Sequence, residues 1–231
     1  MASQRRINNR LLAALSSTAF AELSDDLHSV ALPKKQVIYE VGEPLDQIYF
    51  IEEGLASVLT MMEDGTSSEV GMVGHEGLIG VSALLGGKVS AQHIVVQLPG
   101  TAYRIAAATC KAVFESNSEI RRVLLRFVED LLNLSSQTAA CNRLHSVDQR
   151  TARWLLMSSD RTDSNVLRLT QEFLAAMLGV RRSGVSEAAG ELQRSGLIRY
   201  RRGEITIVDR AGLEKTACEC YGLDRQRVER P

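Results

Sequence analysis

The chain has little of several residue types, and each shortage argues against a class of protein. Its 231 residues include four cysteines, four prolines and one tryptophan. So few cysteines argue against a disulfide-stabilised secreted protein and favour a reducing cytoplasm. No apolar run approaches the roughly 20 residues that a membrane helix needs, and the polar start does not have the pattern of a secretory signal. We therefore expect a cytoplasmic protein without a membrane partner.

Residues that bind metals are scarce and poorly spaced. Cys218 and Cys220 are separated by one residue instead of two, and no second pair accompanies them, so they do not match a zinc motif. The histidines form no HxH or HExxH pattern. We expect no metal site and no cofactor. The two cysteines are interpreted as small apolar residues of the last helix, and a redox role stays open.

The formal net charge of −1 hides an asymmetry along the chain. Residues 1–145 hold 12 basic and 16 acidic residues, whereas residues 146–231 hold 15 basic and 12 acidic residues. Six arginines lie between Gly179 and Arg202, against two glutamates. A basic surface of this kind attracts the phosphates of nucleic acid, although a run of charges can also be a solvated helix face.

The spacing of apolar residues divides the first half of the chain into two regions. Residues 7–28 show helical spacing and predict one or two short helices. From about residue 30 to residue 106, short apolar runs are punctuated by glycines, which predicts an antiparallel β-roll, also called a double-stranded β-helix. Residues 63–66 contain Asp-Gly and predict a hairpin tip.

A long helix is predicted after the strands. Ser118 is placed to cap its start. The following residues alternate between spacings of four and three, the pattern of a two-stranded coiled coil. We interpret the stripe as the interface of a homodimer, although an ordinary core-facing helix can show the same pattern. The expected interface residues are Ile120, Leu124, Phe127, Leu131, Leu134, Thr138 and Cys141.

The region from residue 169 to residue 210 has the pattern of a winged helix-turn-helix. Thr170 can cap a first helix, and Gly179 suits the left-handed turn that follows it. A second helix is predicted from about Arg181 to about Ser195, with its polar face placed as in a recognition helix. A basic hairpin comes next and has the pattern of a wing. The expected DNA-binding residues are Thr170, Arg181, Arg182, Ser183, Ser186, Glu187, Arg201 and Arg202.

Taken together, these features resemble the Crp/Fnr family of bacterial transcription regulators over about residues 15–222. Residues 41–54, VGEPLDQIYFIEEG, are similar to the β-roll signature of the family. Residues 170–198 are similar to its helix-turn-helix, and the ending ITIVDRAGLEKTACECYG resembles a proteobacterial branch.

This resemblance implies an α+β fold in three parts. A cyclic-nucleotide-binding-like β-roll domain is expected over residues 1–116 and a dimerisation helix over residues 117–145. A winged helix-turn-helix domain is expected over residues 146–231. The family also implies a homodimer without enzyme activity, which binds a pseudo-palindromic operator in double-stranded DNA and contacts RNA polymerase.

The chain departs from the cyclic-AMP-responsive members at the residues that hold the ligand. Those members contact the ribose with a Glu and the cyclic phosphate with an Arg-Ser pair, where this chain has Val81 and Ala91-Gln92. A buried phosphate without a cationic partner is costly, so we expect no cyclic AMP in the usual pose and an effector that is unknown or absent. The candidate effector-pocket residues are Gly80, Val81, Ser82, Ala91 and Gln92.

Two other effectors used by the family are also not expected. Oxygen-sensing members carry an N-terminal cysteine cluster, but the first cysteine here is Cys110, so no iron–sulfur cluster of that kind is predicted. Haem-binding members use a histidine near the later strands of the roll. His75 and His93 stand in that region, but a solvated or core histidine is the simpler interpretation, and we expect no haem.

The recognition helix departs from the family as well. Many relatives present Arg, then Glu, then Arg four residues later, and here Arg182, Ser183 and Glu187 stand at these positions. Arg182 suits guanine, and Glu187 can accept a hydrogen bond from a cytosine amino group. The sequence therefore predicts a DNA half-site that differs from the best-known operators.

Three alternatives stay open from the sequence. A cupin-like β-barrel metalloenzyme needs clustered histidine and carboxylate ligands, which His75 and His93 do not supply. A sensor whose winged helix binds protein instead of DNA is disfavoured by the arginine density. A cyclic-nucleotide-responsive regulator is disfavoured by the missing phosphate ligands.

Overall fold

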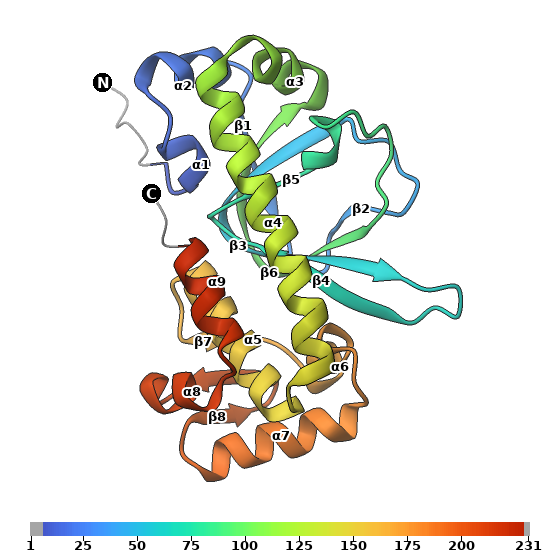
Figure 1. The fold of residues 1–231 in the computed structure, drawn as a ribbon, viewed down its shortest axis with the longest axis vertical. Helices are drawn as coiled ribbons and strands as arrows, with labels where there is room; N and C mark the ends of the chain where they lie inside the picture. Colours follow the sequence, from blue (N-terminus) through green and yellow to red (C-terminus); the bar gives the residue numbers. More distant parts are fainter. Residues whose placement is uncertain (1–6, 229–231) are drawn as a thin grey trace. The chain divides into compact units, whose positions relative to one another are not determined.

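A computed structural model describes residues 7–228 (Figure 1). The chain divides into two compact units, and each unit combines two segments of the chain. The first unit contains the residues up to Ala56 and the segment Val73–Leu131. The second unit contains Ser57–Met72 and the residues from Leu132 onward. The boundaries of the three parts predicted from the sequence stay a prediction.

The first unit contains an antiparallel sheet and the short helices that precede and follow it. In its sheet, β6 pairs with β1, β2 and β3, and β5 pairs with β3. This architecture confirms the predicted α+β fold with an N-terminal antiparallel roll. The elements are α1 (Arg10–Ala13), α2 (Ser17–Ser24), β1 (His28–Leu32), β2 (Val37–Tyr39), the first part of β3 (Gln47–Met61), β5 (Leu78–Ile79), the 3-10 helix η1 (Val81–Ala83), β6 (His93–Ala106), α3 (Ala107–Ser116) and the first part of α4 (Ser118–Leu144).

The strands of the roll alternate as a half-buried sheet requires. At the start of β3, Ile48 and Phe50 are fully buried, whereas Gln47 and Tyr49, which precede them, are partly exposed. The chain makes one very close approach at Gly100, where a Cβ atom would lie 1.9 Å from the carbonyl oxygen of Glu53. Only glycine fits that position, so the glycines that punctuate the sequence are part of how the roll closes.

The predicted hairpin tip forms at the end of β3. Gly65 has a φ of 82°, and the Thr66 amide donates a 2.9 Å hydrogen bond to the Asp64 carboxylate. The Met62 amide closes the turn with a 2.8 Å bond to the carbonyl of Thr66. The Asp-Gly pair therefore makes the turn that its chemistry favours.

The start of helix α4 differs from the sequence prediction by one residue. The side-chain oxygen of Asn117 accepts hydrogen bonds from the amides of Glu119 (2.9 Å) and Ile120 (3.1 Å). Asn117 is therefore the N-cap, and Ser118 is the first helical residue. Both residue types are good caps, and only the backbone geometry distinguishes them.

The second unit contains helices, a three-stranded sheet and the hairpin of β3 and β4. Its small sheet has the order β7-β9-β8. The elements are the last part of β3, β4 (Ser67–Val73, of which Val73 belongs to the first unit), the last part of α4, α5 (Val147–Thr162), β7 (Val166–Leu167), α6 (Gln171–Leu178), α7 (Arg182–Arg194), β8 (Ile198–Arg201), β9 (Glu204–Ile207), α8 (Arg210–Thr216) and α9 (Cys220–Val228).

Helix α5 is the central element of the second unit. A capping box of Ser146 and Gln149 starts it, and most of its side chains are buried. The indole N–H of Trp154 donates a 2.8 Å hydrogen bond to the buried carboxylate of Glu69 on β4. At its other end, Arg161 forms a buried two-pronged pair with Asp224 of α9, at 2.8 and 3.1 Å. Polar contacts therefore fix both β4 and α9 to this helix.

Between residues 7 and 228, no helix combines the length and the apolarity that crossing a membrane requires.

Candidate functional site

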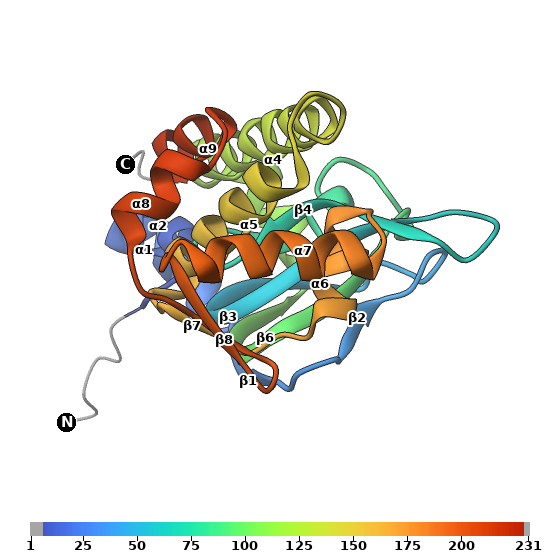
Figure 2. The same cartoon turned by 90° about the horizontal axis from the view of Figure 1, so that it is seen from below.

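Helices α6 and α7 form the expected helix-turn-helix (Figure 2). The hydroxyl of Thr170 accepts the amide of Phe173 at 3.2 Å, so Thr170 caps α6 as predicted. Gly179 ends α6 in the left-handed conformation, with a φ of 61°. The chain then turns into α7, which begins one residue after Arg181. These local signals explain why the two helices and their turn were predictable.

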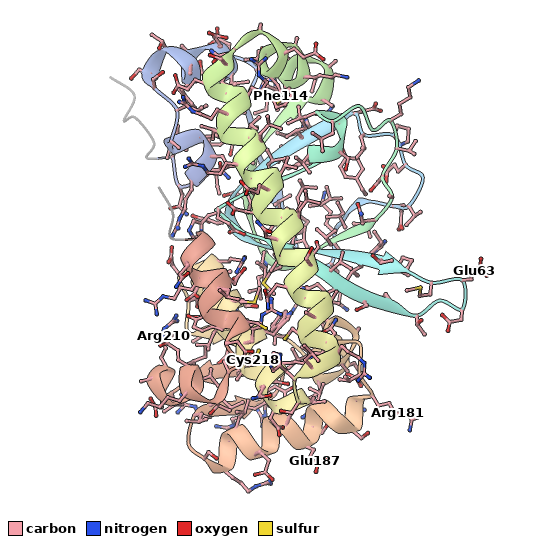
Figure 3. The ribbon with its side chains drawn as sticks, viewed as in Figure 1. Glu63, Phe114, Arg181, Glu187, Arg210 and Cys218 are labelled. Carbon is pink, nitrogen blue, oxygen red and sulfur yellow. The ribbon has the colours of Figure 1, made fainter. Side chains whose placement is uncertain are left out.

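Helix α7 separates an apolar face from a polar one. The inner stripe is fully buried and consists of Val185, Ala188, Ala189 and Leu192. Arg181, Arg182, Ser183 and Glu187 are exposed. Arg181 and Glu187 project away from the ribbon of α7 in Figure 3. The N-terminal half of this helix therefore offers two cations, a hydroxyl and a carboxylate to solvent.

Two of the predicted DNA-binding side chains are held by helix α6. Arg182 forms an exposed ion pair with Glu172 at 3.0 Å. Ser186 is partly buried, and its hydroxyl donates a 2.6 Å hydrogen bond to the side-chain oxygen of Gln171. Arg182 is therefore oriented but exchangeable, because exposed ion pairs are weak. Ser186 contributes to the contact between the helices.

The wing is a tight hairpin with a strained arginine at its tip. Arg201 pairs with Glu204 across strands β8 and β9. The two turn residues, Arg202 and Gly203, both have positive φ, at 51° and 77°. A type I′ turn requires this geometry, and Asn-Gly is the usual sequence for it. Arginine rarely adopts a positive φ, so the tip of the wing carries backbone strain.

A hydrogen bond connects the wing to the recognition helix α7. The backbone amide of Tyr200 donates a 2.7 Å hydrogen bond to the side-chain oxygen of Gln193 on α7. Arg201 and Arg202 are exposed beyond this contact. Helix and hairpin therefore present their arginines from one connected scaffold.

The candidate effector residues lie in the first unit, around η1 and the loop that follows it. Gly80 has a φ of 92°, and Val81 and Ser82 are partly exposed in η1. Ala91 is exposed, and the carbonyl of Gln92 accepts a 2.7 Å hydrogen bond from the Ser90 hydroxyl. No arginine stands between Arg10 and Arg104 in the sequence.

Two protein families match the chain, each over part of its length. The Crp-like helix-turn-helix domain matches residues 149–216, and the cyclic nucleotide-binding domain matches residues 29–117. The CRP-like cAMP-activated global transcriptional regulator of Mycobacterium tuberculosis is 24% identical over 216 residues, which cover 90% of this chain and 96% of that protein. The chain belongs to the Crp/Fnr family of transcription regulators. It is therefore a DNA-binding regulator and not an enzyme, which excludes the cupin-like alternative.

Solved structures share the fold of this Crp/Fnr regulator. FixK2 from Bradyrhizobium japonicum has a TM-score of 0.72 at 16% identity and covers 83% of this chain and 98% of its own. A CRP/FNR-family transcriptional regulator of Thermus thermophilus has a TM-score of 0.69 at 24% identity, with coverage of 82% and 98%. At these identities the likeness concerns the fold alone.

The predicted dimer stripe of this Crp/Fnr regulator has a different role in the structure. Five of its seven residues are buried within their own chain, between 0% and 6% exposed: Ile120, Leu124, Phe127, Leu134 and Cys141. Phe127 packs so closely against Gly77 that a Cβ atom there would lie 2.3 Å from the phenyl ring. The alternating spacing therefore marks the core-facing side of α4, which shows the same period as a coiled-coil seam.

Another side of α4 carries exposed apolar residues. Leu125 and Leu132 are 42% and 65% exposed, and Ala139 is also exposed. These three residues recur every seven positions, so they lie along one face of the helix. Sequence spacing alone did not distinguish this stripe from the buried one.

The structure also brings together cysteines and a histidine that lie far apart in the sequence. Cys141 and His145 at the end of α4 lie beside Cys218 and Cys220, and their potential ligand atoms are all within 4.8 Å of one another. The prediction that the chain has no metal site was based on the spacing of Cys218 and Cys220 and did not include Cys141 and His145. The sequence does contain a second short pair that indicates metal ligands, Cys-x-x-x-His at residues 141–145.

Proposed function

We propose that this regulator is a homodimer that binds a pseudo-palindromic DNA site through α7 and the wing. The observation that carries the proposal is the exposed arginine surface of α7, β8 and β9 above a fully buried apolar stripe. In this arrangement two recognition helices enter successive major grooves about 34 Å apart. Because DNA is its target, we also propose that it acts in the cytoplasm and contacts RNA polymerase there.

The roles of the DNA-facing residues follow from their chemistry and exposure. Arg182 reads a guanine by exchanging the carboxylate of Glu172 for the two acceptors on the base edge. Glu187 accepts a hydrogen bond from a cytosine amino group. Arg181, Arg201 and Arg202 contact phosphates, which makes binding strongly dependent on salt. Thr170 and Ser183 make secondary contacts, and Ser186 holds α7 against α6.

The dimer contact that we propose uses the exposed stripe of α4. Leu125, Leu132 and Ala139 are the apolar residues on that face. Leu132→Glu places a charge at the more exposed of the two leucines, so it is expected to convert the dimer to a monomer. Sedimentation velocity measures the change. Glu129→Gln on the same helix is the matched control and keeps the dimer. A dimer that persists in Leu132→Glu would exclude this stripe as the interface.

We propose further that no cyclic nucleotide binds the roll in the usual pose. Val81, Ala91 and Gln92 supply no charge at the positions that hold the ribose and the cyclic phosphate in cyclic-AMP-responsive members. Titration calorimetry with cyclic AMP is expected to show no binding at micromolar concentrations. Micromolar binding would overturn this part of the proposal and favour a cyclic-nucleotide-responsive regulator.

The experiment that tests the function is selection of bound sites from random duplex DNA with the purified, ligand-free protein. Enrichment of a two-fold symmetric motif, lost at high salt, is the expected result. Random recovery of sites by a folded dimer would contradict sequence-specific binding without an effector.

A further inference from the structure

The second unit brings together four side chains whose atoms are good metal ligands. The amide of His145 donates to the carbonyl of Cys141 at 3.1 Å, so both residues lie on one face at the end of α4. Cys218 lies in the turn after α8, and Cys220 begins α9. Figure 3 labels Cys218 in this part of the second unit. Three sulfurs and an imidazole nitrogen therefore meet from two segments of the chain that are far apart in sequence.

Two of the distances between the potential ligand atoms match the edges of a tetrahedron around a single ion. The sulfurs of Cys141 and Cys218 are 3.5 Å apart, and the sulfur of Cys220 is 3.7 Å from Nδ1 of His145. With zinc–sulfur bonds of about 2.3 Å and zinc–nitrogen bonds of about 2.0–2.1 Å, the edges of a tetrahedron are about 3.5–3.8 Å. A disulfide would need the sulfurs at about 2.05 Å.

The surrounding residues orient the ligands as metal sites require. The second ring nitrogen of His145, Nε2, lies 3.1 Å from the carboxylate of Glu219, which leaves Nδ1 directed at the sulfurs. The side-chain amide of Gln137 donates a 3.0 Å hydrogen bond to the sulfur of Cys220. A carboxylate behind a ligating histidine is the usual outer-shell partner, because it fixes the ring and raises its basicity.

The charges near the cluster are also complementary to a metal–thiolate group. Three thiolates and a neutral imidazole around a divalent ion have a net charge of −1. Arg150 and Arg153 of α5 are buried, at 8% and 6% exposure, and interact electrostatically with Cys141. The Nε atoms of both arginines lack a hydrogen-bond partner in the part of the chain that the structure describes. Buried cations need a nearby negative charge, and metal-bound thiolates supply one.

We propose that Cys141, His145, Cys218 and Cys220 form a tetrahedral zinc site. Zinc binding forms four metal–ligand bonds and releases the protons of the three thiols. Because four protein ligands fill the coordination sphere, the site is structural and leaves no open position for catalysis. It joins the end of α4 to the start of α9, which follows the wing and helix α8 in the chain.

The compact geometry favours one ion over an iron–sulfur cluster. A cluster distributes its protein ligands over separate irons, so those ligands stand further apart than the ligands of one ion. Here every ligand atom is within 4.8 Å of every other. The three cysteines are also almost completely buried, between 1% and 4% exposed, which protects thiolates from oxidation.

Elemental analysis of the full-length protein, purified under reducing conditions without chelator, tests the site directly. One zinc per chain is expected. Replacement of zinc by cobalt(II) is expected to give the intense visible bands of a tetrahedral cobalt–thiolate centre. This measurement does not involve DNA, so its failure and the failure of the proposed regulator function are distinguishable.

Variants locate the ligands. Cys141→Ser and Cys218→Ser are each expected to hold at least about tenfold less zinc, and Glu219→Gln is expected to weaken binding about 10–100-fold without abolishing it. Cys110→Ala is the matched control, because Cys110 is a buried cysteine of the first unit outside the cluster. It is expected to keep one zinc per chain.

Four results would overturn the proposal. The first is a folded, reduced wild-type protein that holds no zinc and takes up neither zinc nor cobalt(II) on titration. The second is stoichiometric iron with inorganic sulfide. The third is a Cys141–Cys218 disulfide in protein purified without oxygen. The fourth is full zinc content in Cys218→Ser. Because the first result uses the wild type, the test does not depend on whether a variant folds.

Discussion

In the first unit, the buried polar side chains of the described residues are Asn9, His75, Ser90 and Gln97, and no Asp, Glu, Lys or Arg is among them. Among the described residues, the second unit buries five residues of the Asp, Glu, Lys and Arg types: Glu69, Arg150, Arg153, Arg161 and Asp224. A buried charge is stable only when a partner compensates it. The first unit therefore depends on apolar packing, whereas the second depends on specific partners and on conditions that change their charge.

The strongest test of this comparison is the pair of Arg161 and Asp224. Both side chains are 3% exposed and form two hydrogen bonds. Asp224→Ala leaves the guanidinium buried without its carboxylate and is expected to lower the free energy of unfolding by about 3–5 kcal/mol. Urea denaturation measures the change.

The matched control is Glu191→Ala, which removes an exposed ion pair with Arg194. Its cost is expected to be below about 1 kcal/mol. Similar losses for the two variants would show that burial does not distinguish these pairs.

Glu69 makes the second unit sensitive to pH. Burial raises the pKa of Glu69 from 4.5 to about 7, and hydrogen bonds from Ser57 and Trp154 oppose this only in part. As the pH rises between these two values, the unfolded chain releases this proton while the folded chain keeps it. The contribution of Glu69 to stability is therefore present at low pH and is lost as the pH rises towards 7.

Glu69→Gln removes this dependence. Between pH 5 and pH 7.5, wild type is expected to lose roughly 2–3 kcal/mol of unfolding free energy relative to the variant. Urea titrations followed by Trp154 fluorescence at several pH values give the two profiles. Parallel profiles would mean that Glu69 titrates alike in the folded and unfolded states.

The exposed arginines of α7 and the wing are expected to affect DNA binding more than the stability of the fold. Arg182→Ala is expected to weaken binding to the selected site by about 1–3 kcal/mol and binding to random DNA very little. Fluorescence anisotropy with both duplexes measures this. Arg194→Ala, at the other end of α7, is the control and leaves the preference unchanged. Equal losses on both duplexes for Arg182→Ala would assign Arg182 to phosphate.

The smallest effect is expected at the tip of the wing. Arg202 has a φ of 51°, which asparagine adopts with less strain. Arg202→Asn is therefore expected to raise the free energy of unfolding by up to about 1 kcal/mol. It also removes one proposed phosphate contact, so the slope of the logarithm of the DNA-binding constant against the logarithm of the salt concentration is expected to fall by about one. Arg199→Asn on β8, where φ is not positive, should give no stabilisation. If Arg202→Asn leaves both stability and salt dependence unchanged, the strained arginine has no role in binding.

Features encoded in neighbouring residues were predictable. The strands of the roll follow from apolar runs separated by glycines, and the hairpin tip follows from Asp64 and Gly65. The helix-turn-helix follows from the cap at Thr170 and the left-handed Gly179. Each of these is a property of a few adjacent residues, whose backbone preferences act before any distant contact forms.

Contacts between distant segments were not predictable in the same way. The apolar spacing of α4 shows that one face is buried, but it does not show whether the chain itself or a second copy covers that face. Likewise, no spacing places Glu69 against Trp154, because these residues lie 85 positions apart.

The sequence by itself therefore determined the kinds of elements in this protein, the family to which it belongs and the surface that carries its arginines. Only the tertiary structure decided which charges are buried, which face of α4 is free and which cysteines meet. Cys141 and Cys218 are 77 positions apart, and their sulfurs come within 3.5 Å only where the end of α4 and the turn before α9 meet in the second unit. Local preferences determine the elements, and the packing of those elements determines which side chains become neighbours.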